Sequence, residues 1–246
     1  MPVIEESVTI SGEKELPAFQ ARPSEEGLHP AVIIVLEIFG LNDHIRSVVR
    51  RLAESGYVAL APDFFRHEPT PYDDFAGARE VASCLSDVGA MEDVGAALDY
   101  LEKQPFVTAG KTGILGFCMG GRLAFLAACH HPDRTRACVD FYGARMSGGG
   151  VHGGHTMVPL EAAPALACPV QFFYGADDHF IPPEEVERVR ERMTSLGKSF
   201  DIQVYEGAGH GFFCDQRESY QSEAATDAWS RTLKFLHEQL GEESVV

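Results

Sequence analysis

The residues best suited to chemistry in this sequence begin with a cysteine between two glycines. The segment Gly116-Phe117-Cys118-Met119-Gly120 follows a short apolar stretch and precedes an alanine-rich one. This is the strand–turn–helix arrangement that usually presents a serine nucleophile, here with cysteine in its place. The glycines fit such a turn, because the nucleophile's backbone is strained and small neighbours let strand and helix pack closely. We therefore interpret Cys118 as a candidate nucleophile.

A thiol that attacks an acyl carbon needs a base to take up its proton, and histidine titrates in the right range. The histidine in turn needs a carboxylate that fixes its tautomer. Asp177 and Asp178 follow one predicted strand, and His210 follows the last one. Both aspartates are candidates, and the order nucleophile, acid, histidine is that of a known class of hydrolases.

Glu37 is a further candidate site residue, because it directly follows an apolar predicted strand. An isolated carboxylate is costly to bury, so it needs a donor such as the thiol of Cys118. The alternative interpretation is an ordinary surface charge at the end of a strand.

The elements that position these residues alternate between strands and helices. Apolar, β-branched stretches predict strands at 30–36, 57–63, 111–117, 136–142, 169–174 and 200–205. Helical periodicity predicts helices at 44–55, 76–104 with a break near 86–87, 120–130, 183–196 and 219–240. Such alternation predicts an α/β fold, a mainly parallel twisted sheet with helices on both faces, as a single domain over residues 1–246. Residues 3–22 predict an N-terminal antiparallel hairpin around Ser11-Gly12.

Composition narrows the possible partners and the compartment. The net charge of −17 argues against nucleic acid and anionic membranes as partners. The N-terminus lacks a signal-peptide pattern, and the longest apolar run, residues 31–36, is too short to cross a bilayer. The six cysteines form no Cys-x-x-Cys pair, which predicts reduced thiols and a cytoplasmic location. The sequence does not decide between a monomer and a homodimer.

No cofactor and no metal are expected. His152 and His155 lie in a glycine-rich stretch without a carboxylate or thiol at a fixed ligand spacing, which makes them a weak ligand set. The expected partner is a small-molecule ester or lactone substrate.

Four motifs in order carry a resemblance to a known family. They are Leu36-Glu37-Ile38-Phe39-Gly40, Gly116-Phe117-Cys118-Met119-Gly120-Gly121, Asp178-His179-Phe180-Ile181-Pro182 and Gly209-His210-Gly211-Phe212. Together they resemble the dienelactone hydrolase (carboxymethylenebutenolidase) family, over about residues 8–240. The resemblance implies an α/β-hydrolase fold and hydrolysis of activated esters or lactones through an acyl-thioester.

The resemblance also implies roles for individual residues. Cys118 would be the nucleophile, His210 its base and Asp178, rather than Asp177, the orienting acid. Glu37 would hold the resting thiol protonated and release it to the histidine when substrate binds. The oxyanion hole would be formed by the backbone N–H groups of Ile38 and Met119, and the substrate-binding residues would be Arg79, Tyr142 and Phe180.

The sequence departs from the family pattern at one position. The family grips a substrate carboxylate with two arginines; Arg79 matches the first, but Cys214 stands where the second is expected, four residues after His210. A thiol cannot replace a bidentate guanidinium, so Arg122 and Arg145 are considered as substitutes. The alternative functions are a non-catalytic small-ligand binding protein and, at Cys118, a redox-sensing thiol.

Overall fold

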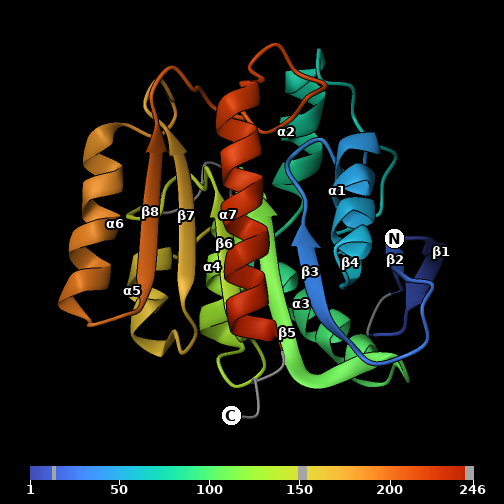
Figure 1. Cartoon of the computed structure of the whole chain (residues 1–246). Helices are drawn as coiled ribbons and strands as arrows, with labels where there is room; N and C mark the ends of the chain where they lie inside the picture. The colour runs from blue at the N-terminus through green and yellow to red at the C-terminus, as the bar shows by residue number, and fades with distance from the viewer. Residues whose placement is uncertain (13–14, 149–153, 242–246) are drawn as a thin grey trace.

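The computed structural model describes residues 1–12, 15–148 and 154–241 (Figure 1). Their strands form one eight-stranded sheet in the order β1-β2-β4-β3-β5-β6-β7-β8. The strands from β3 onward run parallel to their neighbours, whereas β1 and β2 form an antiparallel hairpin that continues antiparallel onto β4. The predicted mainly parallel sheet and N-terminal hairpin are therefore confirmed.

The strands span β1 (Val3–Ile10), β2 (Leu16–Pro23), β3 (His29–Val35), β4 (Val58–Pro62), β5 (Val107–Phe117), β6 (Ala137–Phe141), β7 (Val170–Gly175) and β8 (Phe200–Tyr205). Every residue of β4, β6 and β7 is buried, as their continuous apolar sequences predict for strands covered on both faces. The central strands thus form a rigid platform, and the chain emerges from their carboxyl ends along one edge of the sheet.

Helices cover both faces of the sheet, as Figure 1 shows. On one face α1 (Asp43–Glu54) packs against β2 and β4, and α7 (Ser222–Leu240) packs against β5 and β6. On the other face lie α3 (Asp87–Glu102) and α4 (Met119–His130). The remaining helices are α2 (Phe75–Ser83), α6 (Pro183–Ser195), the short α5 (Pro159–Ala162) and a 3-10 turn at Ala163–Ala165, of which the last two were not predicted.

The predicted break near residues 86–87 separates two helices. Ser86 accepts a hydrogen bond from the backbone N–H of Gly89 and so begins α3, while α2 has already ended at Ser83. This division frees α2 to pack separately from α3, and its Ala78 and Ala82 contact Ile38 and Phe39.

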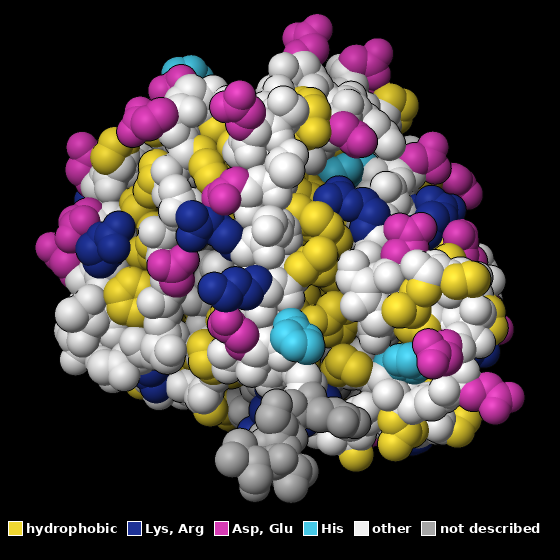
Figure 2. Space-filling model, in the orientation of Figure 1, with side chains coloured by type: hydrophobic (Ala, Val, Ile, Leu, Met, Phe, Trp, Pro, Cys, Tyr) yellow, Lys and Arg dark blue, Asp and Glu magenta, His cyan; other side chains and the backbone are white. Residues whose placement is uncertain are grey.

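The surface reflects the acidic composition. Figure 2 shows acidic side chains spread over the visible face, with lysines and arginines among them. Within the described ranges, no helix combines the length and apolarity that crossing a membrane requires.

Candidate active site

Cys118 lies in a strained turn between β5 and α4. Its backbone has φ 56° and ψ −121°, a conformation that residues with side chains rarely adopt. A Cβ on Gly116 would lie 2.0 Å from the carbonyl oxygen of Gly120, and one on Gly120 would lie 2.2 Å from that of Val35. The two glycines are thus required by close backbone contacts, as the motif predicts. The thiol stands at the N-terminus of α4, where the helix dipole favours negative charge.

His210 connects Cys118 to an aspartate. Its Nδ1 lies 2.7 Å from Oδ2 of Asp178, and Asp178 Oδ1 accepts the backbone N–H of Phe180 at 2.8 Å. The other ring nitrogen is left for the thiol of Cys118, which is near enough to His210 to influence its pKa. Asp178 is buried and Asp177 is exposed, so of the two aspartates only Asp178 meets the histidine.

The charges around His210 favour its protonated form. Burial alone would lower the pKa of His210, but negative charge on Cys118 and the hydrogen bond with Asp178 raise it to about 10. The surroundings of His210 therefore favour its imidazolium form.

The backbone N–H groups predicted for an oxyanion hole are those of Ile38 and Met119, and among the described residues neither donates to a backbone acceptor. Met119 is the first residue of α4, so its N–H has no acceptor within the helix. Ile38 lies just beyond β3, and its N–H donates to no backbone acceptor in the described part of the chain. The side chain of Met119 packs against the cluster that contains Ile38.

Glu37 is buried, with 1% of its surface exposed, so the alternative of a surface charge is wrong. Its Oε1 accepts a hydrogen bond from Tyr72 Oη at 3.0 Å, and its Oε2 lies 3.5 Å from Nη1 of Arg217. Both carboxylate oxygens are thus engaged, and the expected contact with the thiol of Cys118 is not among the hydrogen bonds of Glu37 in the described residues. Burial raises the pKa of Glu37, although Arg217 and Tyr72 oppose that shift.

Arg217 is the positively charged partner of Glu37, and it was not predicted from the sequence. It lies seven residues after His210, beyond Cys214. Gly211 makes room for it: this residue has φ +79°, and a Cβ there would approach Arg217 Nη1 to 2.5 Å. The combination of glycine directly after the histidine with an arginine further along the same turn was the available signal.

The three arginines considered from sequence differ in their surroundings. Arg79 is exposed on α2 and forms no ion pair in the described residues. Arg122 is buried, and its Nη1 and Nη2 donate to the two carboxylate oxygens of Asp87 at 2.6 and 3.0 Å. It is therefore not available to a substrate. Arg145 is exposed in the loop after β6.

Two predicted aromatic residues flank His210. The ring of Tyr142 is fully buried, with its centroid 5.2 Å from that of His210. Its hydroxyl has no hydrogen-bond partner in the described residues. Phe180 is 61% exposed and its ring lies 5.1 Å from His210, which places it at the mouth of the site.

Of the two histidines considered as metal ligands, the structure describes only His155. His155 is buried and its Nδ1 lies 2.8 Å from Oδ1 of Asp87, beside Arg122. His152 lies outside the described residues.

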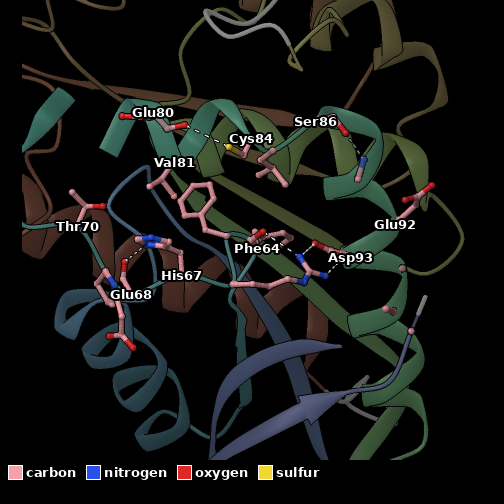
Figure 3. A pocket seen from close by; sticks show the side chains of 18 of the residues that line it. Phe64, His67, Glu68, Thr70, Glu80, Val81, Cys84, Ser86, Glu92 and Asp93 are labelled. Atoms are coloured by element: carbon pink, nitrogen blue, oxygen red, sulfur yellow. Dashed lines mark hydrogen bonds and ion pairs between the residues drawn. The ribbon is translucent and has the colours of Figure 1, made fainter. Parts of the chain in front are cut away.

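A large cavity of about 1190 Å³ lies apart from these residues (Figure 3). It is enclosed by the loop at residues 64–71, α2 and the first turns of α3, and Cys118, Asp178 and His210 are not among its lining residues. Its walls carry acidic side chains, including Glu80, Glu92 and Asp93. The candidate catalytic residues therefore do not line this cavity.

The parallel sheet, the strained cysteine turn and the Cys118–His210–Asp178 arrangement are those of an α/β-hydrolase. Residues 16–240 match the model of the dienelactone hydrolase family, which spans most of the chain. The chain belongs to the dienelactone hydrolase family. It is accordingly an enzyme of the carboxylic ester hydrolase class, as the motifs predicted.

Individual relatives agree with this assignment. A protein of Methylorubrum extorquens, provisionally named a carboxymethylenebutenolidase, is 37% identical over 226 residues, which cover 91% of this chain and 77% of the relative. A Bradyrhizobium protein, provisionally named a 2-oxo-3-(5-oxofuran-2-ylidene)propanoate lactonase, is 36% identical and covers 93% of this chain and 91% of its own length. A crystal structure from Klebsiella pneumoniae, provisionally described as a dienelactone hydrolase, superposes with a TM-score of 0.90 at 33% identity, covering 97% of this chain and all of that one.

Proposed function

We propose that this chain hydrolyses activated esters or lactones through a covalent acyl-thioester on Cys118. The observation that carries the proposal is that His210 is held by Asp178 at 2.7 Å and is influenced electrostatically by Cys118, which stands in a strained turn. Nucleophile, base and orienting acid then occupy the three positions that acyl transfer requires.

The reaction proceeds in two halves. His210 takes the proton of the Cys118 thiol, and the thiolate attacks the acyl carbon. The N–H groups of Ile38 and Met119 stabilise the resulting oxyanion, each by about 3 kcal/mol. Collapse expels the alcohol or enol oxygen, which takes the proton from His210. A water that gives its proton to His210 then attacks the thioester, and the departing thiolate recovers the proton.

A thiolate is itself a good leaving group, so the first half succeeds best when the substrate's leaving oxygen is also stable as an anion. Enol lactones and activated esters meet this condition, whereas ordinary alkyl esters return to thiolate and starting ester. Cysteine in place of serine thus selects for substrates with good leaving groups.

The substrate class we propose carries a carboxylate next to the lactone. Arg217 is 18% exposed and contacts Glu37 only at 3.5 Å, so it has capacity for a second anion. The lactone named for the Bradyrhizobium relative is a propanoate and bears such a group. Tyr142 and Phe180 are proposed to line the acyl side of the pocket, and Arg79 to contribute at its mouth. Glu37 is proposed to govern the protonation of Cys118.

The test is a panel of lactones and short esters, with and without a carboxylate. Cys118→Ala is expected to abolish hydrolysis, and iodoacetamide to abolish it in the wild type. Cys84→Ala is the matched control, because Cys84 is an exposed thiol away from the triad; it should retain full activity and full sensitivity to iodoacetamide. Undiminished hydrolysis by Cys118→Ala would refute the proposal. Absence of turnover by the wild type, with binding intact, would favour a ligand-binding protein.

Arg79→Ala tests the contribution at the mouth of the pocket. It should weaken turnover of carboxylate-bearing lactones more than that of neutral esters. Equal effects on both would remove Arg79 from the substrate-binding residues.

The proposed setting of the enzyme is the cytoplasm, as a monomer or homodimer that binds no nucleic acid. The net charge of −17 and the six free cysteines support this proposal. Size-exclusion chromatography with light scattering would distinguish monomer from dimer.

A further inference from the structure

Tyr72 joins segments of the chain that are far apart in sequence. Its hydroxyl lies 3.0 Å from Oε1 of Glu37, 3.0 Å from Nδ2 of Asn42 and 3.2 Å from Sγ of Cys214. Glu37 follows β3, Asn42 caps α1, and Cys214 belongs to the turn after His210. Tyr72 itself belongs to the loop before α2, part of which forms a wall of the cavity in Figure 3.

The direction of each hydrogen bond at this hydroxyl is fixed by its neighbours. Oδ1 of Asn42 accepts the backbone N–H of Ile45 at 3.1 Å, so its amide nitrogen is the atom that donates to Tyr72. Burial raises the pKa of Cys214 to about 11, so at neutral pH this thiol is protonated and also donates to Tyr72. A hydroxyl has one proton and two lone pairs. With both lone pairs taken, the proton of Tyr72 points to Glu37.

The ring of Tyr72 is fixed as firmly as its hydroxyl. It makes an edge contact with Phe39 at a centroid distance of 4.7 Å, and the guanidinium of Arg217 lies 5.6 Å from its centroid. The loop that carries it is fastened by the backbone N–H of Thr70, which donates to the carbonyl of Phe39 at 3.0 Å. Tyr72 therefore presents its proton to Glu37 from a rigid support.

We propose that Tyr72 is a positioning residue that holds Glu37 away from Cys118, so that the thiol stays paired with His210. The proposal rests on the proposed function, because it assumes that the Cys118–His210 pair is the reacting unit. A buried carboxylate takes whatever donors are near it. Tyr72 and Arg217 occupy one oxygen each. A Glu37 that lost the hydrogen bond from Tyr72 would instead accept one from the thiol of Cys118, which would stabilise the thiol in its protonated form.

The test measures the reactivity of Cys118 directly, without any substrate. The rate of its alkylation by iodoacetamide is followed against pH by mass spectrometry of the Cys118 peptide, which separates it from Cys84. Tyr72→Phe keeps the ring contacts and removes the hydroxyl, and with it the proton donated to Glu37 and the acceptor used by Asn42 and Cys214. We expect the midpoint of the profile to move to higher pH, with about a tenfold lower rate at neutral pH for each pH unit of movement.

A double-mutant cycle with Glu37 separates positioning from a general structural effect. In a Glu37→Gln background, Tyr72→Phe should leave the profile unmoved, because the carboxylate that it releases is gone. The matched control is Tyr205→Phe, which removes a different phenol–carboxylate hydrogen bond, 2.8 Å from Asp227, and should leave the profile in place. Near-ultraviolet circular dichroism confirms that each variant is folded.

Two results would overturn the proposal: an unmoved midpoint in Tyr72→Phe, or a movement of equal size in the Glu37→Gln background. Failure of the proposed function is recognised separately with His210→Ala. If Cys118 alkylates identically without His210, the Cys118–His210 pair is not the reacting unit, whatever Tyr72 does.

Discussion

Two buried carboxylate–arginine pairs in this molecule are built differently. Asp87 and Arg122 make two short contacts of 2.6 and 3.0 Å, with side chains 0% and 4% exposed. Glu37 and Arg217 make one contact of 3.5 Å, and the arginine is 18% exposed. The first pair is closed to solvent and to ligands, and the second has one partner that solvent can reach.

The surroundings of the two carboxylates shift their pKa values in opposite directions. Burial acts to raise the pKa of Asp87, but hydrogen bonds from His155 and Arg122 outweigh it and hold the pKa well below its usual range. The backbone N–H of Met157 adds a further donor at 2.8 Å. For Glu37, burial outweighs its two partners, and the pKa is raised. A carboxylate with a full set of donors is structural, whereas one short of donors is ready to change partners.

The largest expected difference between the pairs is in stability. Arg122→Met leaves Asp87 buried without its main counter-charge, so the free energy of unfolding should fall by about 3–5 kcal/mol. Arg217→Met removes a partly exposed partner and should cost less than about 1 kcal/mol. Urea unfolding followed by circular dichroism measures both. Equal losses would contradict the distinction between the two pairs.

The placement of the proposed nucleophile, base and acid near one another could be predicted because each one follows a strand. Cys118, Asp178 and His210 come after β5, β7 and β8, and parallel strands bring their carboxyl ends to one edge. The pattern of buried β-branched residues fixes those strands, and the glycines of the turn fix the pose of Cys118. The part of the candidate site that is positioned by regular strands could therefore be predicted from the sequence.

The partners of Glu37 could not be predicted, because they depend on irregular backbone. Arg217 reaches the site only because Gly211 adopts φ +79° and the chain folds back through the next turn. Tyr72 stands in a proline-containing loop with no periodicity. Arg122 was considered as a substrate-binding residue for a different reason. Its ion pair with Asp87 joins α4 to the start of α3, and residue spacing along the chain does not reveal that contact.

A smaller effect is expected on substrate preference. Arg217→Met should lower kcat/KM for a carboxylate-bearing dienelactone by about 30–150-fold, which corresponds to losing about 2–3 kcal/mol from a charged hydrogen bond. Hydrolysis of p-nitrophenyl acetate, which has no carboxylate, should change by less than about threefold. Steady-state kinetics on both substrates checks this.

Arg190→Met is the control for that experiment. Arg190 is an exposed arginine on α6 that pairs with Glu187 at 3.4 Å, and its loss should alter neither substrate. A uniform loss on both substrates in Arg217→Met would show that this residue supports the site without binding a carboxylate.

The smallest expected effect is a dependence of stability on pH that has opposite signs for the two carboxylates. Because the folded pKa of Glu37 is raised, its ionised form costs stability at neutral pH, and protonation relieves that cost as the pH falls through the folded value. Glu37→Gln should therefore be more stable than the wild type at pH 7, by on the order of 1 kcal/mol, and the advantage should vanish at lower pH.

Asp87 has a lowered folded pKa, so its contribution to stability is present above its ordinary value of 3.8 and is lost only as the pH falls through the folded value. The advantage of wild type over Asp87→Asn should thus stay constant between pH 7 and pH 5. Thermal or urea unfolding at several pH values measures both differences. A Glu37→Gln variant less stable than the wild type at pH 7 would mean that Arg217 and Tyr72 fully satisfy this carboxylate, and that it is as structural as Asp87.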